Sequence, residues 1–219
     1  MNLTVIIPAL DANQLLPAAV ARLRGDPVDE IIVADGGTVP PPSGLGDEVT
    51  VISASPGRGL QLKAGAEAAS GDWLLFLHAD TRLGEGWREA VRDHVRDQSD
   101  KAAVFRFALD DDSSPARRLE RIVALRCRVL ALPYGDQGLL IPRGLYQAVG
   151  GFRPIPLMED VDIIRRIGRA RLRYLDVAAI TSAARYRREG YLRRMGRNLV
   201  CLSLFFAGVD PARIRKLYA

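Results

Sequence analysis

Cysteine is scarce in this chain. Among 219 residues there are two cysteines, Cys127 and Cys201, which lie far apart with no CxxC pair and no cluster of metal ligands beside them. This pattern is not that of a disulfide framework. Both cysteines stand in apolar surroundings typical of helices, and we expect them to be reduced core residues of a cytosolic protein.

Long apolar runs and aromatic residues are also few. The most apolar late stretch, residues 199–209, is about half of the roughly 20 residues that a spanning helix needs, so we expect no membrane span. The first residues, MNLTVIIPAL, enter a strand pattern without a basic leader, so we expect no signal peptide. Aromatic residues make up 6% of the chain, few for a module that stacks nucleic-acid bases, and no nucleic-acid partner is expected.

The remaining composition suits a globular domain with anionic partners. Apolar residues make up 48% and charged residues 26%, which allows one sizeable core. The formal net charge of +5 and a pI near 9.5 favour phosphates, nucleotides, nucleic acid or an anionic membrane surface without choosing among them.

Short apolar runs alternate with segments of helical periodicity in the first half of the chain. We expect strands at residues 3–7, 30–34, 49–52 and 73–77, and helices at residues 15–23 and 60–69. This alternation predicts an α/β fold with a mainly parallel sheet and helices on both faces. Ligands of such sheets bind beyond the carboxyl ends of the strands.

Three of these strands end in carboxylates. Asp11 follows the first strand, Asp35 the second and Asp80 the fourth, where it comes directly after His78 and Ala79. A single aspartate at a strand end is commonly a turn former or a helix cap. Three of them at the same edge of one sheet would converge on one crevice, which is the candidate site.

The segment SPGRGLQLKAG begins the second expected helix. Its glycines permit a close approach of the backbone, and Arg58, Gln61 and Lys63 supply hydrogen-bond donors. The free amides of a helix start suit a phosphate or diphosphate. The first turn, PALDANQ, has neither the GxGxxG of a dinucleotide-binding domain nor the GxxxxGK of a P-loop. A nucleotide would therefore be bound in another way.

Several blocks of the sequence resemble those of a known family. VIIPAL, EIIVADGG, GRGLQLKAGAEAASGDWLLFLHADT and GGFRPIPLMEDVDIIRRIGR are similar to the ordered signature blocks of family 2 glycosyltransferases. The tail from TSAARYRREGYLRRMGRNLV to DPARIRKLY resembles a small, compact bacterial subgroup with HADT in the DxD place. The resemblance implies the GT-A fold, a nucleotide-diphospho-sugar donor, a divalent cation (Mn²⁺ or Mg²⁺), and inverting transfer by single displacement.

In this resemblance HAD occupies the DxD place. Asp80 would ligate a divalent cation that bridges the donor diphosphate, because a hard cation takes oxygen ligands and stabilises a diphosphate leaving group. His78 replaces the usual aspartate, which leaves metal dependence open. His78 itself could bond the ribose, ligate the metal or pack in the core.

The donor side of the site follows from the same blocks. Asp35 matches the position that contacts the uracil or ribose, and a carboxylate accepts well from a base N–H or a ribose hydroxyl. Arg58 and Lys63 match basic positions of the donor loop, or are solvated helix charges. The full set of expected donor-binding residues is Pro8, Ala9, Asp11, Asp35, Arg58, Lys63, His78, Ala79 and Arg185.

The catalytic residues are expected in MEDVDIIRR. Inverting transfer needs a general base for the acceptor hydroxyl, and Asp160 matches the base of the family's ED block, with Glu159 shaping the acceptor pocket. Without the resemblance, two acids at a helix start would be read as charges that match the helix dipole. Asp136 and Gln137, in YGDQGLLIPRG, are expected on the acceptor or sugar side.

The tail is rich in arginine. Arg185 stands where processive members carry QxxRW, although the Gln and Trp are missing, so only Arg185 is carried over as a diphosphate ligand. A basic face is indicated by further arginines at 173, 187, 188, 193, 194 and 197. This face would contact anionic lipid or a partner chain, or be the solvated side of a packed helix.

The alternation of strands and helices, together with the resemblance, predicts one GT-A domain over residues 1–219, with a nucleotide-sugar-binding half (1–100), an acceptor and catalytic half (101–184) and a basic helical tail (185–219). The predicted activity is inverting glycosyl transfer from a nucleotide-diphospho-sugar, with a UDP-sugar as the expected donor. The expected location is cytoplasmic, with peripheral contact at the inner membrane face left open. The alternatives are a non-catalytic basic binding module and a sugar nucleotidyltransferase, which needs a Gly-rich basic first loop that PALDAN does not provide.

Overall fold

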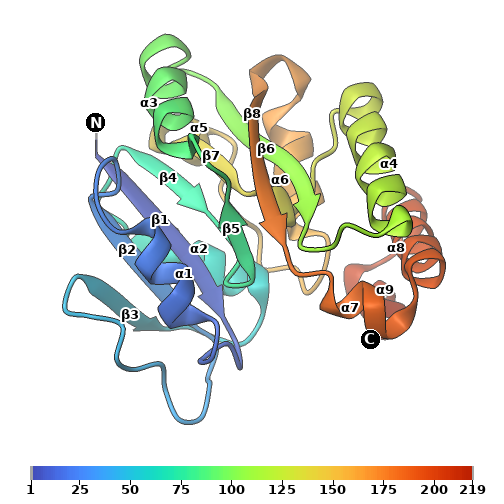
Figure 1. The fold of residues 1–219 in the computed structure, drawn as a ribbon, viewed down its shortest axis with the longest axis horizontal. Helices are drawn as coiled ribbons and strands as arrows, with labels where there is room; N and C mark the ends of the chain where they lie inside the picture. Colours follow the sequence, from blue (N-terminus) through green and yellow to red (C-terminus); the bar gives the residue numbers. More distant parts are fainter. Residues whose placement is uncertain (1, 219) are drawn as a thin grey trace.

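An eight-stranded mixed sheet runs through the computed structural model, which describes residues 2–218 (Figure 1). The strand order is β3-β2-β1-β4-β7-β6-β8-β5. The strands are β1 (Leu3–Ala9), β2 (Glu30–Asp35), β3 (Val49–Ser53), β4 (Trp73–Phe76), β5 (Thr81–Leu83), β6 (Ala102–Leu109), β7 (Leu139–Pro142) and β8 (Leu172–Thr181).

The parallel part of the sheet is the part that the sequence predicts. Strands β3, β2, β1 and β4 pair in parallel, and they correspond to the four expected strands. The second half adds antiparallel pairs, since β7 runs antiparallel to β4 and β6, and β5 runs antiparallel to β8. Strands β6 and β8 are parallel to each other. The α/β fold is confirmed, and the antiparallel pairs make the sheet mixed.

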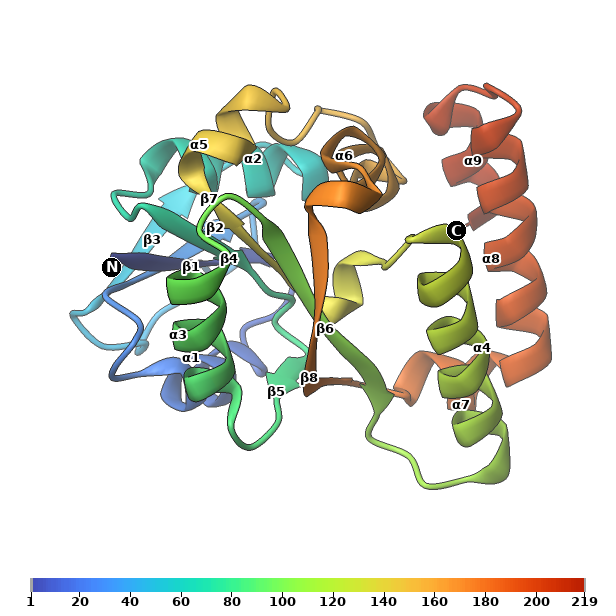
Figure 2. The same ribbon diagram turned by 90° about the horizontal axis from the view of Figure 1, so that it is seen from above.

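Two cores lie on the two faces of the sheet. Strand β1 is buried on both sides, because Val5 and Ile7 face one core and Ile6 faces the other. One face is covered by α1 (Leu16–Leu23) and α3 (Trp87–Asp97). The other is covered by α2 (Arg58–Ala68), α5 (Arg143–Ala148) and α6 (Glu159–Ile167) (Figure 2). Burial on both faces accounts for the nearly continuous apolar sequence of these strands.

A group of helices stands at one end of the sheet, beyond β6 and β8 (Figure 2). It consists of α4 (Ser114–Leu130), α7 (Ala184–Glu189), α8 (Tyr191–Phe206) and α9 (Pro211–Tyr218). Two short 3-10 turns, η1 (Gly135–Gln137) and η2 (Arg169–Arg171), precede β7 and β8. Cys127 and Cys201 are buried and unbridged, as expected. Within residues 2–218, every helix is too short or too polar to cross a membrane.

Candidate active site

A cleft opens where β4, η1 and the start of α6 meet the helices of the tail. It receives side chains from the first half of the chain, from the middle and from α7 to α9. The lining residues are Arg58, His78, Asp80, Tyr134, Asp136, Leu157, Met158, Asp160, Thr181, Ser182, Arg185, Tyr186, Arg194, Asn198 and Tyr218. Six residues predicted from the sequence therefore share one cleft: Arg58, His78, Asp80, Asp136, Asp160 and Arg185.

His78 and Asp80 reach this cleft from the end of β4. The buried apolar strand pairs with β1 and β7, and the chain then turns through a hydrogen bond from Thr81 N–H to the His78 carbonyl (3.1 Å). Burial, together with the positive charge of Arg58, lowers the pKa of His78 to about 3. His78 is therefore a neutral imidazole at physiological pH.

Asp160 is held at the first turn of α6. Its Oδ2 accepts the Gly135 N–H (2.8 Å) and its Oδ1 accepts the Val161 N–H (2.8 Å). A Cβ built on Gly135 would lie 3.0 Å from His78 Nε2 and 3.3 Å from Asp160 Oδ2. A glycine at 135 thus lets η1 pack between the two side chains. The two amide hydrogen bonds fix the orientation of the Asp160 carboxylate at the start of α6.

Glu159 lies behind the cleft wall. Its side chain is 1% exposed and forms an ion pair with Arg58, whose Nη2 also lies 3.8 Å from Asp160 Oδ2. Burial raises the pKa of Glu159, and the charge of Arg58 opposes this shift. A Cβ on Gly59 would lie 2.6 Å from the Arg153 carbonyl, so the start of α2 packs closely on the loop before α6. Glu159 therefore positions Arg58 and is absent from the cleft lining.

Asp136 and Gln137 of η1 lie in different surroundings. Burial raises the pKa of Asp136 to about 6, with added contributions from the negative charges of Asp160 and Asp80, and its Oδ1 is buried without a hydrogen-bond partner. Gln137 is buried and donates to the Phe105 carbonyl (2.9 Å). Asp136 thus lies in the cleft, whereas Gln137 lies in the interior and supports the turn.

Asp80 and Asp136 are the residues that could hold a cation. Among residues 2–218, no three His, Cys, Asp or Glu side chains are grouped to form a metal cage. Magnesium, however, is usually bound through one or two carboxylates plus phosphate oxygens and water. The unpartnered Oδ1 of Asp136, beside the charge of Asp80, fits a cation whose shell is completed by a phosphate-bearing ligand.

The wall opposite these acids is basic and aromatic. Arg194 of α8 is buried, and it donates to Glu189 Oε1 (3.0 Å) and to the Tyr218 hydroxyl (3.1 Å). Its guanidinium also lies over the ring of Tyr186 (5.3 Å to the centroid). No sequence pattern indicates that Arg194, Asn198 or Tyr218 belongs to the site, because their position in the cleft depends on how the tail folds back.

The tail arginines do not share one face. Arg185 and Arg194 line the cleft, and Arg197 pairs with Glu189. Arg187 lies 3.7 Å from Asp110 Oδ1. The basic face expected over residues 185–197 is therefore divided between the cleft, internal ion pairs and solvent.

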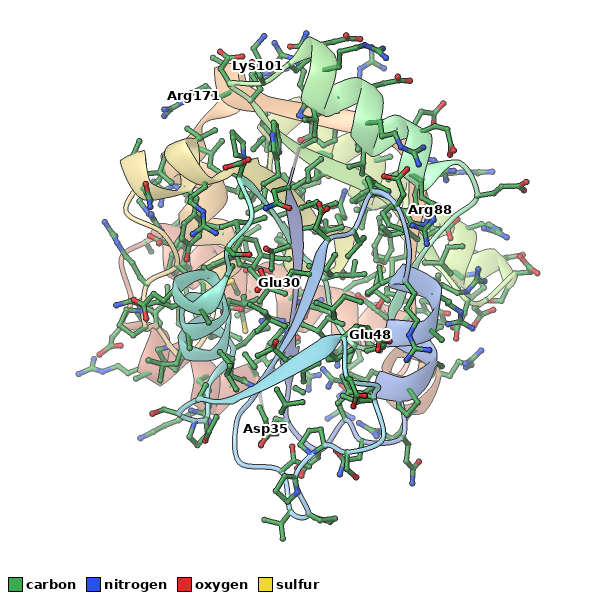
Figure 3. All side chains as sticks on the ribbon, turned by 90° about the vertical axis from the view of Figure 1, so that its left-hand side faces the viewer. Glu30, Asp35, Glu48, Arg88, Lys101 and Arg171 are labelled. Carbon is green, nitrogen blue, oxygen red and sulfur yellow. The ribbon has the colours of Figure 1, made fainter. Side chains whose placement is uncertain are left out.

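The expected nucleoside site lies at the ends of β1 and β2, outside the lining of this cleft. Glu30 begins β2 and Asp35 ends it (Figure 3). Asp35 is 6% exposed. Its carboxylate accepts from the Thr38 hydroxyl (2.5 Å) and N–H (3.1 Å) and from the Gly37 N–H (3.2 Å). These contacts are those of a turn former, and they hold the loop after β2 in place.

Around Asp35 the strand ends are fixed by Gln61, which donates to the carbonyls of Ala9 (2.5 Å) and Ala34 (3.0 Å). Pro8 and Ala9 end β1, and Asp11 is exposed with a positive φ of 53°. Ala79 is half-buried between His78 and Asp80. Lys63 lies elsewhere, 47% exposed and 3.8 Å from Glu67, so the structure does not bring it to the cleft.

Comparison with known proteins shows the family and the fold. Residues 4–156 match the family model described as Glycosyl transferase family 2. S. aureus TarS 1–349 is 12% identical with a TM-score of 0.62, and the match covers 100% of this chain and 70% of that one. Glucosyl-3-phosphoglycerate synthase from Mycobacterium tuberculosis, in complex with Mn²⁺, UDP and glucosyl-3-phosphoglycerate, is 16% identical with a TM-score of 0.61 over 95% of this chain and 80% of that one.

A third similar structure is the mannosyltransferase PcManGT from Pyrobaculum calidifontis in complex with GDP-Man and Mn²⁺. It is 16% identical with a TM-score of 0.62, over 90% of this chain and 59% of that one. At such identities these structures show a shared fold. No curated protein sequence matches the chain.

Proposed function

The chain belongs to glycosyl transferase family 2, and we propose that it moves a sugar from a nucleotide-diphospho-sugar to an acceptor hydroxyl with inversion at the anomeric carbon. The observation that carries this proposal is the convergence of Asp160, Asp80 and Asp136 with a set of arginines on one cleft. A carboxylate base facing cationic groups is the arrangement that displacement of a diphosphate requires.

The donor's diphosphate would lie against the basic wall. Arg58, Arg185 and Arg194 line the cleft and supply positive charge where the leaving group becomes more negative. We propose a UDP-sugar as the donor, with Asp35, Pro8 and Ala9 beside the base. A complex of TarS with UDP-GlcNAc supports a UDP-sugar, and the complex of PcManGT with GDP-Man supports testing GDP-sugars too.

A divalent cation would be held by Asp80, with Asp136 beside it. When bound, such a cation supplies positive charge to the diphosphate and so stabilises it as a leaving group. The structures of M. tuberculosis glucosyl-3-phosphoglycerate synthase and PcManGT contain Mn²⁺ with their nucleotides, which supports this choice.

Asp160 is the proposed general base. Its carboxylate takes the proton of the acceptor hydroxyl as that oxygen bonds to the anomeric carbon. The bond from the anomeric carbon to the diphosphate oxygen breaks on the opposite side, and its electron pair leaves with the nucleoside diphosphate. The Gly135 and Val161 amides fix the carboxylate in place and leave it lone pairs for the proton.

His78 would contribute a hydrogen bond on the donor side. Its pKa of about 3 keeps the imidazole neutral, so it adds no positive charge near the arginines. A neutral ring can both donate and accept, which suits a ribose hydroxyl.

The test is a titration of the purified protein with UDP-, GDP- and dTDP-sugars by calorimetry, with and without Mn²⁺. We expect saturable binding of one nucleotide class and slow release of its nucleoside diphosphate, with water as the acceptor. If the folded protein binds none of these donors in either condition, the proposal is wrong.

A further inference from the structure

Two helices of the end group expose large apolar side chains to solvent. On α4, Ile122, Leu125 and Val129 are 50%, 61% and 57% exposed. Spacings of three and four residues place them on one helical face. On α8, residues Leu192, Leu199 and Phe206 are 84%, 64% and 48% exposed, and spacings of seven align them in the same way. We call these six residues the α4–α8 face.

The two stripes belong to neighbouring helices. Met195 of α8 packs against the cluster that contains Leu119 and Val123 of α4, and α4 and α8 lie side by side in Figures 1 and 2. Leu199 is one turn after Met195, and Ile122 is one turn after Leu119, so each stripe borders the line of contact between the helices. The exposed side chains therefore form one patch.

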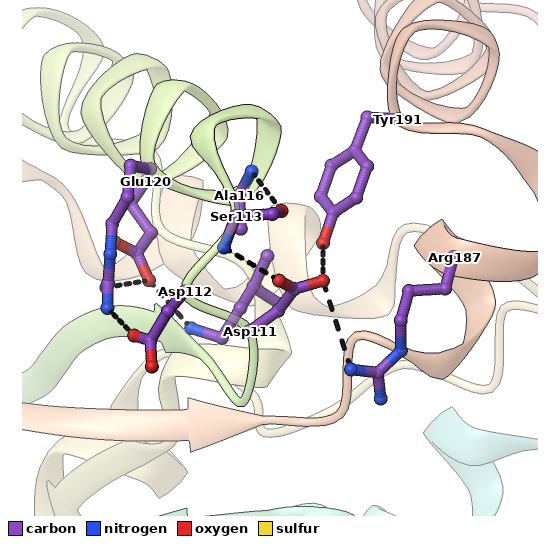
Figure 4. A network of polar contacts seen from close by, with 9 residues as sticks. Asp111, Asp112, Ser113, Ala116, Glu120, Arg187 and Tyr191 are labelled. Atoms are coloured by element: carbon purple, nitrogen blue, oxygen red, sulfur yellow. Dashed lines mark hydrogen bonds and ion pairs between the residues drawn. The ribbon is translucent and has the colours of Figure 1, made fainter.

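Polar contacts fix this helix pair. The Tyr191 hydroxyl at the start of α8 donates to Asp111 Oδ2 (2.7 Å), just before α4 (Figure 4). Asp111 Oδ1 also accepts the Ser113 N–H (2.8 Å), and Ser113 Oγ caps α4 through the Ala116 N–H (3.4 Å). The patch is thus presented by an anchored pair of helices.

Charge around the patch is almost entirely positive. Helices α4 and α8 together contain eight arginines and one glutamate. Of these arginines, Arg194 lines the cleft, and Arg117 and Arg197 are held in ion pairs. Arg118, Arg121, Arg128 and Arg193 are exposed, and each forms no ion pair with another described residue. If this face bound a second copy of the chain, two positively charged surfaces would be brought together.

We propose that the α4–α8 face docks on the surface of an anionic lipid bilayer, with the apolar stripes in the interface and the arginines against the headgroups. Leu and Phe beside arginine are the composition of interfacial helices, and each basic residue near an anionic membrane adds to the affinity. The like charge of two faces disfavours a second copy as the occupant. The apolar stripes disfavour nucleic acid, which offers them no apolar surface.

Docking would place the cleft beside the bilayer. The side of α8 away from the stripe carries Arg194 and Asn198, which line the cleft. The docking surface and the cleft thus share one helix. Binding to a bilayer can be measured without sugar transfer, so the docking proposal does not depend on enzymatic turnover.

The experiment is co-sedimentation with vesicles of phosphatidylcholine alone or mixed with phosphatidylglycerol, at low ionic strength. Wild type is expected to bind the anionic vesicles and to bind the neutral vesicles much more weakly. Leu125→Glu with Leu199→Glu is expected to reduce binding roughly tenfold or more. Its matched control, Val39→Glu with Val51→Glu, adds the same charge at exposed apolar positions elsewhere and should retain more binding.

A second pair of variants tests the arginines. Arg118→Gln with Arg193→Gln is expected to weaken binding roughly 25-fold, at about fivefold per arginine. Arg22→Gln with Arg82→Gln removes two exposed arginines elsewhere and should change binding much less. Circular dichroism and nucleotide binding show which variants are folded, and these readouts also separate failure of docking from failure of the proposed transfer reaction.

Three results would overturn the docking proposal. The first is no binding of wild type to anionic vesicles. The second is equal loss in the face variants and their matched controls. The third is a wild-type dimer that Leu125→Glu with Leu199→Glu converts to monomer, since the face would then be an interface between copies.

Discussion

The raised pKa of Asp136 leads to a prediction about stability. Burial, joined by the negative charges of Asp160 and Asp80, raises this pKa to about 6 from an ordinary value of 3.8. The native state therefore binds a proton more readily than the unfolded chain does. The stabilisation of the folded protein by Asp136 is fully present below the pKa that this residue has in the unfolded chain. It is lost as pH rises through about 6. Asparagine cannot ionise, so Asp136→Asn should become more stable relative to wild type as pH rises.

The size of this effect follows from the two pKa values. From these pKa values, the free energy of unfolding that Asp136 contributes falls by about 2 kcal/mol between about pH 4.5 and about pH 8. Partial solvent access to the cleft reduces this loss to about 1 kcal/mol. The assay is urea denaturation of wild type, Asp136→Asn and the exposed control Asp100→Asn at both pH values. The reasoning fails if the free energies of unfolding of wild type and Asp136→Asn change equally with pH.

Three further predictions concern the arginine and acid groups of the site. Arg58→Gln leaves the buried Glu159 carboxylate without its partner, so it should destabilise the protein by about 2 kcal/mol at pH 7 and by less in acid, as measured by urea denaturation; an unchanged midpoint at pH 7 would contradict this. Asp35→Ala should weaken nucleotide binding roughly tenfold or more through loss of a charge-assisted hydrogen bond, and equal affinity in calorimetry would remove Asp35 from the site. Asp80→Asn should abolish any Mn²⁺ dependence of nucleoside diphosphate binding; metal-independent binding by wild type would instead indicate that Arg58 and Arg185 neutralise the diphosphate.

The first half of the fold follows from the sequence because its signals are local. Strands β1 and β4 are short apolar runs, and each leads directly to the polar residues at its carboxyl end. Strand ends alone predict that Asp11, Asp35 and Asp80 converge on one crevice, but only Asp80 of these three lines the cleft. Asp160, which shares the cleft with Asp80, is expected there through the resemblance. The family and the fold are confirmed.

Other features depend on contacts between distant segments. The sequence around Gln137 does not show that its side chain turns inward to Phe105, and the sequence around Lys63 does not show that it lies on another surface. Likewise, no local pattern shows that α8 folds back and brings Arg194 to the cleft. Helical periodicity says which residues share a face, but not what that face meets. The antiparallel pairing of β5 with β8 is equally non-local, because it joins residues 81–83 to residues 179–181.

The central claim is that Asp160 is the base of a sugar transfer reaction, and Asp160→Asn tests it most directly. The measurement is the rate of nucleoside diphosphate release from the donor that the calorimetric panel identifies, together with the dissociation constant of that donor. Asparagine is nearly the same size but accepts no proton, so kcat should fall by about 10² to 10⁴ with donor affinity close to wild type. If folded Asp160→Asn protein released the product at the wild-type rate, Asp160 would not be the base, and Asp136 would be the next candidate in the cleft.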